Sequence, residues 1–273
     1  MDEGPAPDLE QQPKLDASVA HSARVWDYWL GGKDNFAADR AAGEQVRAVL
    51  PDIVDAARVD RGFLVRAVRH LAGEVGMRQF LDVGSGLPTA NNTHQVAQSV
   101  APECRVLYVD NDPMVLAHAR ALLTSGPHGR TDYIDADIRD SDRILREATR
   151  TLDLDRPVVI MLLGIVQFIV DTGRARAIVH RFLDAVPPGS YLVLAHPASG
   201  FSDAVEAAIQ LWNTTGGAPQ VLRTAGEVAG FLDGLELLDP GVVSCPRWRP
   251  DPADPVSDLD VAPWRLCGVG RKL

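Results

Sequence analysis

The chain has 273 residues, 46% hydrophobic and 23% charged, which suits one large α/β domain with a helical attachment. Its formal net charge is −10 at pH 7 and Lys and Arg form no run, so nucleic acid is a disfavoured partner. Three widely spaced cysteines, no signal-peptide pattern and no apolar run of about 20 residues argue against a disulfide framework and a membrane partner, and favour a cytoplasmic protein.

The N-terminal quarter is predicted to be a short tail followed by helices. Residues 1–16 are polar and proline-rich, which is typical of a disordered tail. Residues 17–75 are expected to form a helical cap, because apolar side chains recur there with helical spacing. The predicted helices of the cap are 18–30, 36–50 and 52–72.

Residues 76–273 are predicted to form the α/β domain. Strands and helices alternate there, and the strands are nearly continuous apolar runs, which indicates a parallel sheet covered on both faces. The predicted strands are 79–83, 105–109, 131–134, 157–163 and 190–195, with strand-like pieces at 235–238, 241–245 and 264–269. The predicted helices are 90–99, 113–123, 141–150, 173–186, 202–213 and 224–233. We expect a doubly wound, Rossmann-like sheet of about seven mostly parallel strands, the last pair partly antiparallel.

The main chemical signal is a glycine turn between the first predicted strand and the helix that follows it. Gly84 and Gly86 flank Ser85 and let the backbone bend tightly and approach a ligand closely. The second strand ends at Asp110, with Asn111 beside it, and a carboxylate there can accept hydrogen bonds from both ribose hydroxyls of a nucleoside. The sequence therefore predicts a nucleoside site at the carboxyl edge of the sheet.

The residues around this turn favour S-adenosylmethionine over a dinucleotide. A dinucleotide site has a third glycine where this chain has Thr89, and Asp82 ahead of the turn is typical of S-adenosylmethionine sites. After the third strand, Asp137 is placed to accept a hydrogen bond from the adenine amine, and Ile138 to pack on the ring. The acids of this stretch can also form a solvated loop, and we predict no metal site.

The segment HSARVWDYWLGGKDNFAADR, residues 21–40, resembles the N-terminal signature of the actinobacterial S-adenosyl methyltransferase family, long described as a domain of unknown function. The similarity continues through FLDVGSGLPTANNTHQVAQ, VLYVDNDPMVLAHARALL and PPGSYLVLAH, and covers nearly the whole chain after the tail. The resemblance implies a class I methyltransferase fold that binds S-adenosylmethionine and carries additional helices in front.

On that resemblance, the first helix and the turn after it fold over the cofactor. Arg24 or Asn35 is expected to hold the methionine carboxylate and Asp27 to face the ammonium group. Tyr28 is expected to lie near the sulfonium, because aromatic faces attract cations. The two tryptophans of the helix are expected to pack in the core: Trp26 and Trp29.

The end of the fourth strand departs from the family pattern. Family members often carry a histidine there, whereas this chain has Gln167, which can hydrogen-bond but cannot accept a proton usefully at neutral pH. Leu163, at the strand end, is expected to line the cofactor. His196 ends the fifth strand and is a weak candidate for a catalytic base, although a strand-end histidine is more often structural.

These features predict a methyltransferase that acts on a small molecule the sequence does not identify. The acceptor pocket is expected between the N-terminal helices and residues 197–220, with Trp212 in its wall. The lack of a definite base leaves open a protein that binds the cofactor without transfer, as a sensor or partner subunit. A nicotinamide-dependent oxidoreductase is a third hypothesis, which Thr89 opposes. The sequence does not indicate an oligomeric state.

Overall fold

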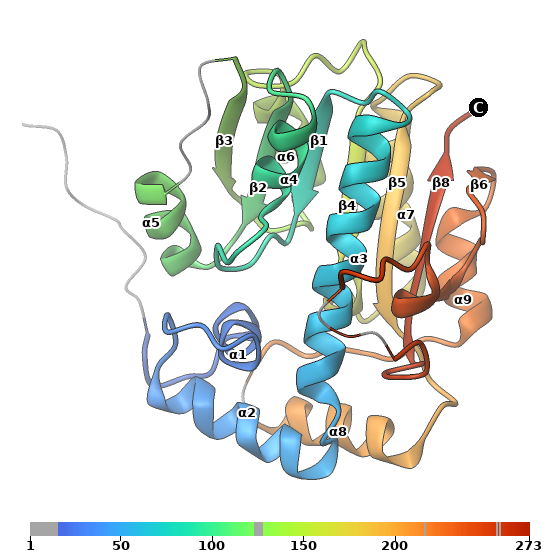
Figure 1. Cartoon of the computed structure of the whole chain (residues 1–273). Helices are drawn as coiled ribbons and strands as arrows, with labels where there is room; N and C mark the ends of the chain where they lie inside the picture. The colour runs from blue at the N-terminus through green and yellow to red at the C-terminus, as the bar shows by residue number, and fades with distance from the viewer. Residues whose placement is uncertain (1–15, 123–127, 216, 255, 257) are drawn as a thin grey trace, which may run out of the picture.

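The computed structural model describes residues 16–122, 128–215, 217–254, 256 and 258–273, which form a doubly wound α/β fold (Figure 1). Apart from residue 16, the predicted tail lies outside these residues. The described strands form one sheet in the order β3-β2-β1-β4-β5-β8-β6, with β7 also paired to β8. The first five strands pair in parallel, and β8 runs antiparallel to β5. This order confirms the predicted fold class.

The strands lie close to their predicted positions. Their bounds are β1 Gln79–Val83, β2 Arg105–Asp110, β3 Arg130–Asp135, β4 Val159–Leu163, β5 Tyr191–Pro197, β6 Glu236–Leu237, β7 Val243–Ser244 and β8 Arg265–Arg271. The described sheet has eight strands instead of about seven, because the two short strands β6 and β7 both pair with β8.

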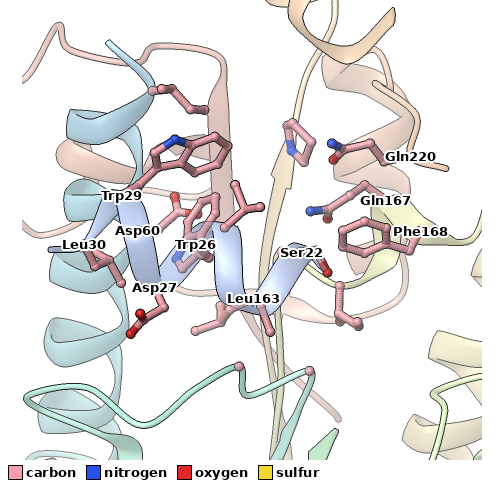
Figure 2. Close-up of a pocket in the computed structure, with 18 of the residues that line it drawn as sticks. Ser22, Trp26, Asp27, Trp29, Leu30, Asp60, Leu163, Gln167, Phe168 and Gln220 are labelled. Carbon is pink, nitrogen blue, oxygen red and sulfur yellow. The ribbon is translucent and has the colours of Figure 1, made fainter. Parts of the chain in front are cut away.

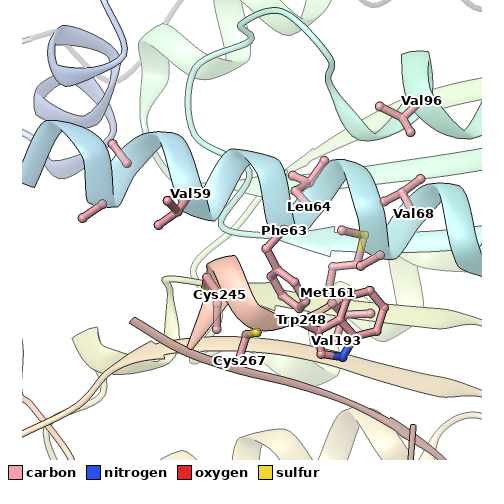
Figure 3. Close-up of a cluster of buried hydrophobic side chains, with 14 of the residues drawn as sticks. Val59, Phe63, Leu64, Val68, Val96, Met161, Val193, Cys245, Trp248 and Cys267 are labelled. Atoms are coloured by element: carbon pink, nitrogen blue, oxygen red, sulfur yellow. The ribbon is translucent and has the colours of Figure 1, made fainter. Parts of the chain in front are cut away.

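Alternate side chains of the central strands enter two hydrophobic cores, one on each face of the sheet. On one face, Met161 and Val193 pack beneath Phe63 of the helix α3, Ile53–Gly73 (Figure 3). On the other face, Leu81 and Ile160 pack with the helices that follow β3 and β4. Because both faces are covered, nearly every residue of these strands is apolar. The helices of the α/β part are α4 Thr93–Val100, α5 Pro113–Leu122, α6 Ser141–Ala148, α7 Thr172–Asp184, α8 Asp203–Thr214 and α9 Ala225–Ala229.

Three N-terminal helices precede the sheet: α1 Ser22–Trp29, α2 Ala37–Val49 and α3 Ile53–Gly73. Figure 1 shows α1, α2 and α8 gathered beyond the carboxyl ends of the parallel strands, while α3 runs from them along the sheet. Side chains of α3 belong to the same core as β1, β4 and β5. The predicted division between residues 75 and 76 therefore falls between parts that share one core.

Local signals explain most helix ends. The first helix stops before Gly31, whose φ of 82° is a left-handed conformation that glycine adopts without strain. The last predicted helix, 224–233, is a short α9 followed by a 3-10 turn, Gly230–Leu232. No helix of the described residues is long and apolar enough to span a membrane. The three cysteines are buried, and none forms a disulfide.

Candidate functional site

A cavity of about 180 Å³ lies where the carboxyl ends of β1, β2, β4 and β5 meet the N-terminal helices. Figure 2 shows α1 crossing it, with Trp26 and Trp29 on the side of α3, and Gln167 and Gln220 on the opposite side. In open α/β sheets the loops beyond the carboxyl ends of the strands form the ligand crevice. The predicted cofactor residues that line the cavity are Asp82, Gly84, Ser85, Gly86, Asp110, Asn111, Leu163 and Gln167.

The glycine turn after β1 has the backbone geometry that the sequence predicts. Gly84 and Gly86 have φ angles of 77° and 66°. A Cβ atom on Gly84 would lie 2.7 Å from the side chain of Ile165, so this position has no room for a larger residue. A Cβ atom on Gly86 would meet no atom within 4 Å, so a ligand can approach the backbone closely at this second glycine.

Asp110 holds this turn in place and faces the cavity. Its Oδ2 accepts a 2.8 Å hydrogen bond from the backbone N–H of Gly86. Its Oδ1 accepts from the backbone N–H groups of Asn111, at 2.9 Å, and Asp112, at 3.1 Å. Burial raises the pKa of Asp110 even though these donors favour its charged form. The carboxylate is thus fixed at the end of β2, facing the cavity.

Asp82 lies deeper, beneath the glycine turn. Its Oδ2 accepts a 2.6 Å hydrogen bond from Thr93 Oγ1, and its side chain is almost completely buried. Burial raises the pKa of Asp82 to about 6, and the nearby guanidinium of Arg61 moderates that rise. Asp82 therefore carries a charge at neutral pH that is only partly compensated inside the protein.

Arg61 on α3 is a cavity residue that the sequence analysis missed. It donates hydrogen bonds to Thr89 Oγ1 and Asn92 Oδ1, whereas its buried Nε has no partner among the described residues. Its position four residues after Ala57 and three before Leu64 puts it on the apolar face predicted for this helix. A cation on a buried helix face was the signal that would have identified it.

The first helix covers the cavity, as the resemblance implies, through one residue that was predicted to face the ligand, Asp27, and two that were not. Trp26, Trp29 and Asp27 line it. Asp27 Oδ2 accepts hydrogen bonds from the backbone N–H of Asp34, at 3.0 Å, and from Asn35 Nδ2, at 2.9 Å. Asn35 therefore shapes the turn and does not line the cavity. Burial raises the pKa of Asp27.

Arg24 and Tyr28, which were predicted to touch the cofactor, do not line the cavity. Arg24 Nε donates to Asp39 Oδ2 at 2.9 Å, and its Nη2 donates to the carbonyl of Val19 at 2.7 Å. The hydroxyl of Tyr28 donates to Glu44 Oε1 at 2.6 Å. Helical periodicity explains the difference, because residues 22, 26 and 29 share one face and residue 28 lies on another. Trp26 and Trp29 pack with the core, as predicted, and they line the cavity as well.

Two further predicted contacts also lie outside the lining. Asp137 accepts hydrogen bonds from Arg139 Nη1, at 2.7 Å, and Asn111 Nδ2, at 3.2 Å. Ile138 is buried in the core on the far face of the sheet. These residues follow β3 and lie beyond the wall of this cavity.

His196 is fully buried and does not line the cavity. Its Nδ1 lies 2.7 Å from the carbonyl of Pro197, and its Nε2 lies 2.8 Å from Nη1 of Arg223. This pattern fits a neutral ring that donates from Nδ1 and accepts at Nε2. Burial lowers the pKa of His196 to about 3. Both nitrogens are occupied by the protein, so the structure gives this weak candidate base no path to a substrate.

The cavity lining also contains a buried ion pair. The guanidinium of Arg265 lies 5.6 Å from the ring centres of both Trp26 and Trp264, and its Nε donates to Asp60 Oδ1 at 3.0 Å. Neither Arg265 nor Trp264 was identified from the sequence. The ion pair joins β8 to α3, and Arg265 also contacts Trp26 of α1. Because these elements are distant in the chain, no local sequence pattern predicts the contact.

The model of one protein family, described as S-adenosyl methyltransferase, matches residues 8–273. A DUF574 family protein from Streptomyces avermitilis is 43% identical, with 95% of this chain and 100% of that chain covered and a TM-score of 0.91. A Thermobifida fusca protein assigned as a methyltransferase is 41% identical, with 97% and 99% covered and a TM-score of 0.88.

A more distant structure shares the fold alone. It is an O-methyltransferase family protein from Burkholderia thailandensis, 16% identical, with 86% of this chain and 59% of that chain covered and a TM-score of 0.51. No curated protein matches the chain.

Proposed function

This chain belongs to the S-adenosyl methyltransferase family, and from that premise we propose that it binds S-adenosylmethionine in the cavity and methylates a small molecule. One observation carries the proposal: Asp110 at the end of β2 holds the backbone of Gly86 and faces the same cavity. A carboxylate in this position suits a ribose diol, and an open glycine beside it suits a nucleoside.

The charges of the lining suit the amino-acid part of the same ligand. The buried Nε of Arg61, without a partner among the described residues, is a donor for the methionine carboxylate. Asp82 and Asp27 are acceptors for the ammonium group. We therefore propose Arg61 for the role first assigned to Arg24 or Asn35, and Trp26 as the aromatic neighbour of the sulfonium in place of Tyr28.

When bound, S-adenosylmethionine supplies a methyl group that the acceptor atom takes as the carbon–sulfur bond breaks, leaving a neutral thioether and releasing a proton from the acceptor. The protein contributes placement and exclusion of water. Asp110 and the glycine turn orient the nucleoside, while α1 covers the opening with Trp26 and Trp29. With this assistance, the reaction needs a general base only when the acceptor group has a high pKa.

The burial of His196 supports a second candidate function. Both ring nitrogens of His196 are hydrogen-bonded within the protein, so this histidine cannot act as a base toward a substrate. Asp60 in the lining is already paired with Arg265. A protein that binds S-adenosylmethionine or S-adenosylhomocysteine without transfer is therefore the alternative. If S-adenosylhomocysteine forms from S-adenosylmethionine in the presence of an acceptor, the protein is a methyltransferase and the alternative is excluded.

Calorimetric titration of S-adenosylmethionine and S-adenosylhomocysteine tests the proposal. We expect Asp110→Ala to weaken both affinities by about 10- to 100-fold, because a charged hydrogen-bond acceptor contributes about 1.5–3 kcal/mol. Asp110→Asn, which keeps the shape of the side chain, should have a smaller effect. Asp184→Ala, at the exposed end of α7, is the matched control.

Thermal unfolding of each variant verifies that it is folded before its affinity is interpreted. If neither ligand binds the wild-type protein, the proposal is wrong. If both ligands bind Asp110→Ala and wild type alike, the site lies elsewhere.

A further inference from the structure

Part of the cavity is walled by aromatic rings. We call it the aromatic end and define it by its aromatic residues: Trp26, Trp29, Phe168, Trp212 and Trp264. Two of these indoles are held by their own hydrogen bonds. Trp29 Nε1 donates to the carbonyl of Gly43 at 3.2 Å, and Trp212 Nε1 donates to that of Ala218 at 2.8 Å. These hydrogen bonds fix the orientation of both indoles.

The aromatic end has no net charge to offer a ligand. Asp60 and Arg265 of the cavity lining are paired with each other. The other Asp and Arg side chains of the lining are those proposed above for the cofactor: Asp27, Arg61, Asp82 and Asp110. Arg265 is further enclosed between the rings of Trp26 and Trp264. A charged ligand would lose its hydration here without gaining a counter-ion, which is costly in a buried site. An uncharged ligand avoids this cost.

Two side chains of the aromatic end carry polar atoms that are buried and unused. Gln167 is 5% exposed, and its Oε1 has no hydrogen-bond partner among the described residues. Trp264 is 4% exposed, and its Nε1 also has no partner there. Buried polar groups are normally hydrogen-bonded, so both atoms point to a missing partner. Since both residues line the cavity, a ligand in the cavity can supply it.

A second amide lies next to Gln167. The backbone N–H of Val221 donates to the carbonyl of Gln167 at 3.0 Å, which joins the segment before α9 to the turn after β4. Figure 2 shows the side chains of Gln167 and Gln220 pointing the same way into the cavity, with the ring of Phe168 beside them. The aromatic end thus combines flat apolar walls with neutral hydrogen-bonding groups on one side.

Resting on the proposed function, we infer that the aromatic end is the acceptor subsite and takes an uncharged aromatic molecule with a hydroxyl or similar neutral substituent. The rings provide apolar contact and stacking for the acceptor. Gln167 and Gln220 bind its substituent from one side, and the indole N–H of Trp264 donates to an oxygen atom. The subsite rejects carboxylates and ammonium groups because no free counter-ion faces it.

Three probes that share one ring system test this assignment: 1-naphthol, 1-naphthoate and 1-naphthylmethylammonium. Each is titrated by calorimetry at pH 7.5 into protein saturated with S-adenosylhomocysteine. We expect 1-naphthol to bind at least tenfold more tightly than either charged probe. Gln167→Leu and Trp264→Phe should each weaken 1-naphthol binding about tenfold. Trp264 is not among the predicted cofactor residues, so Trp264→Phe should change S-adenosylhomocysteine affinity less than twofold. Gln210→Leu, on the exposed side of α8, is the matched control.

The outcomes separate this inference from the proposed function. No binding of S-adenosylhomocysteine to wild type contradicts the proposed function. Normal S-adenosylhomocysteine binding with no 1-naphthol binding, or with equal or tighter binding of a charged probe, overturns the acceptor assignment alone. Unchanged 1-naphthol affinity in both Gln167→Leu and Trp264→Phe removes these side chains from the subsite.

Discussion

Asp82 places a carboxylate in the protein interior at a cost to folding. Its side chain is 4% exposed, and burial raises its pKa from 3.8 to about 6. The folded state therefore binds a proton more tightly than the unfolded state. The free energy of unfolding therefore falls as pH rises from about 4 to about 6, by about 3 kcal/mol in total. Such a cost is typical of a residue placed for a ligand rather than for the fold.

Asp82→Asn is expected to make the protein more stable and to weaken its binding of S-adenosylmethionine. Without ligand at pH 8, the variant should gain up to about 3 kcal/mol in free energy of unfolding, and the gain should shrink toward zero as pH approaches 4. Denaturant unfolding at several pH values measures it. Binding of S-adenosylmethionine should weaken, because an acceptor for the ammonium group is lost. A gain that is the same at pH 8 and pH 4 would contradict the assigned pKa.

At the scale of elements, α1 depends on the turn that follows it. The backbone N–H of Gly32 donates to the carbonyl of Asp27 at 2.8 Å, and the Asp27 carboxylate binds the next residues of the turn. A Cβ atom on Gly32 would lie 1.9 Å from Oδ1 of Asp27. The shape of the turn therefore fixes the position of the Asp27 carboxylate in the cavity.

Gly32→Ala should displace Asp27 and weaken S-adenosylhomocysteine binding by about tenfold or more, the loss of one charged contact. The sheet should stay folded, because Gly32 contributes nothing to its core. Calorimetry measures the affinity and circular dichroism the fold. Gly226→Ala is the control, since a Cβ atom there meets no atom within 4 Å. Equal affinity of Gly32→Ala and wild type would show that Asp27 makes no contact with the ligand.

At the scale of the whole molecule, polar side-chain contacts join the N-terminal helices to the α/β part around the cavity. His21 Nδ1 lies 2.8 Å from Asp112 Oδ2, and Arg265 of β8 forms an ion pair with Asp60 of α3. The cavity is therefore closed by two parts of the chain that approach from opposite sides. A ligand between them should stabilise both together.

S-adenosylhomocysteine at 100 times its Kd should raise the free energy of unfolding by about 2.7 kcal/mol. Because the ligand contacts both parts, amide hydrogen exchange should slow in residues 22–35 as well as 84–86. Exchange measured with and without ligand tests this. Protection confined to residues 84–86 would mean that α1 is not part of the cofactor site.

Much of this molecule follows from local patterns in the sequence. The strands β1, β2, β4 and β5 and the helices between them lie within a few residues of their predicted positions. The glycine turn and Asp110 also meet as predicted. In each case neighbours along the chain determine the result, through apolar runs, glycine conformations and the rule that parallel strands end at one edge.

The sequence by itself thus determined the fold class and the edge of the sheet that carries the cavity, and it predicted the class of cofactor. Only the tertiary structure decided which side of α1 meets the cavity, so Trp26 and Trp29 replaced Tyr28 and Arg24. It also brought Arg61, Gln220, Trp264 and Arg265 into the site. The physical reason is that helical periodicity defines the faces of a helix, whereas packing against distant elements selects the face that is covered.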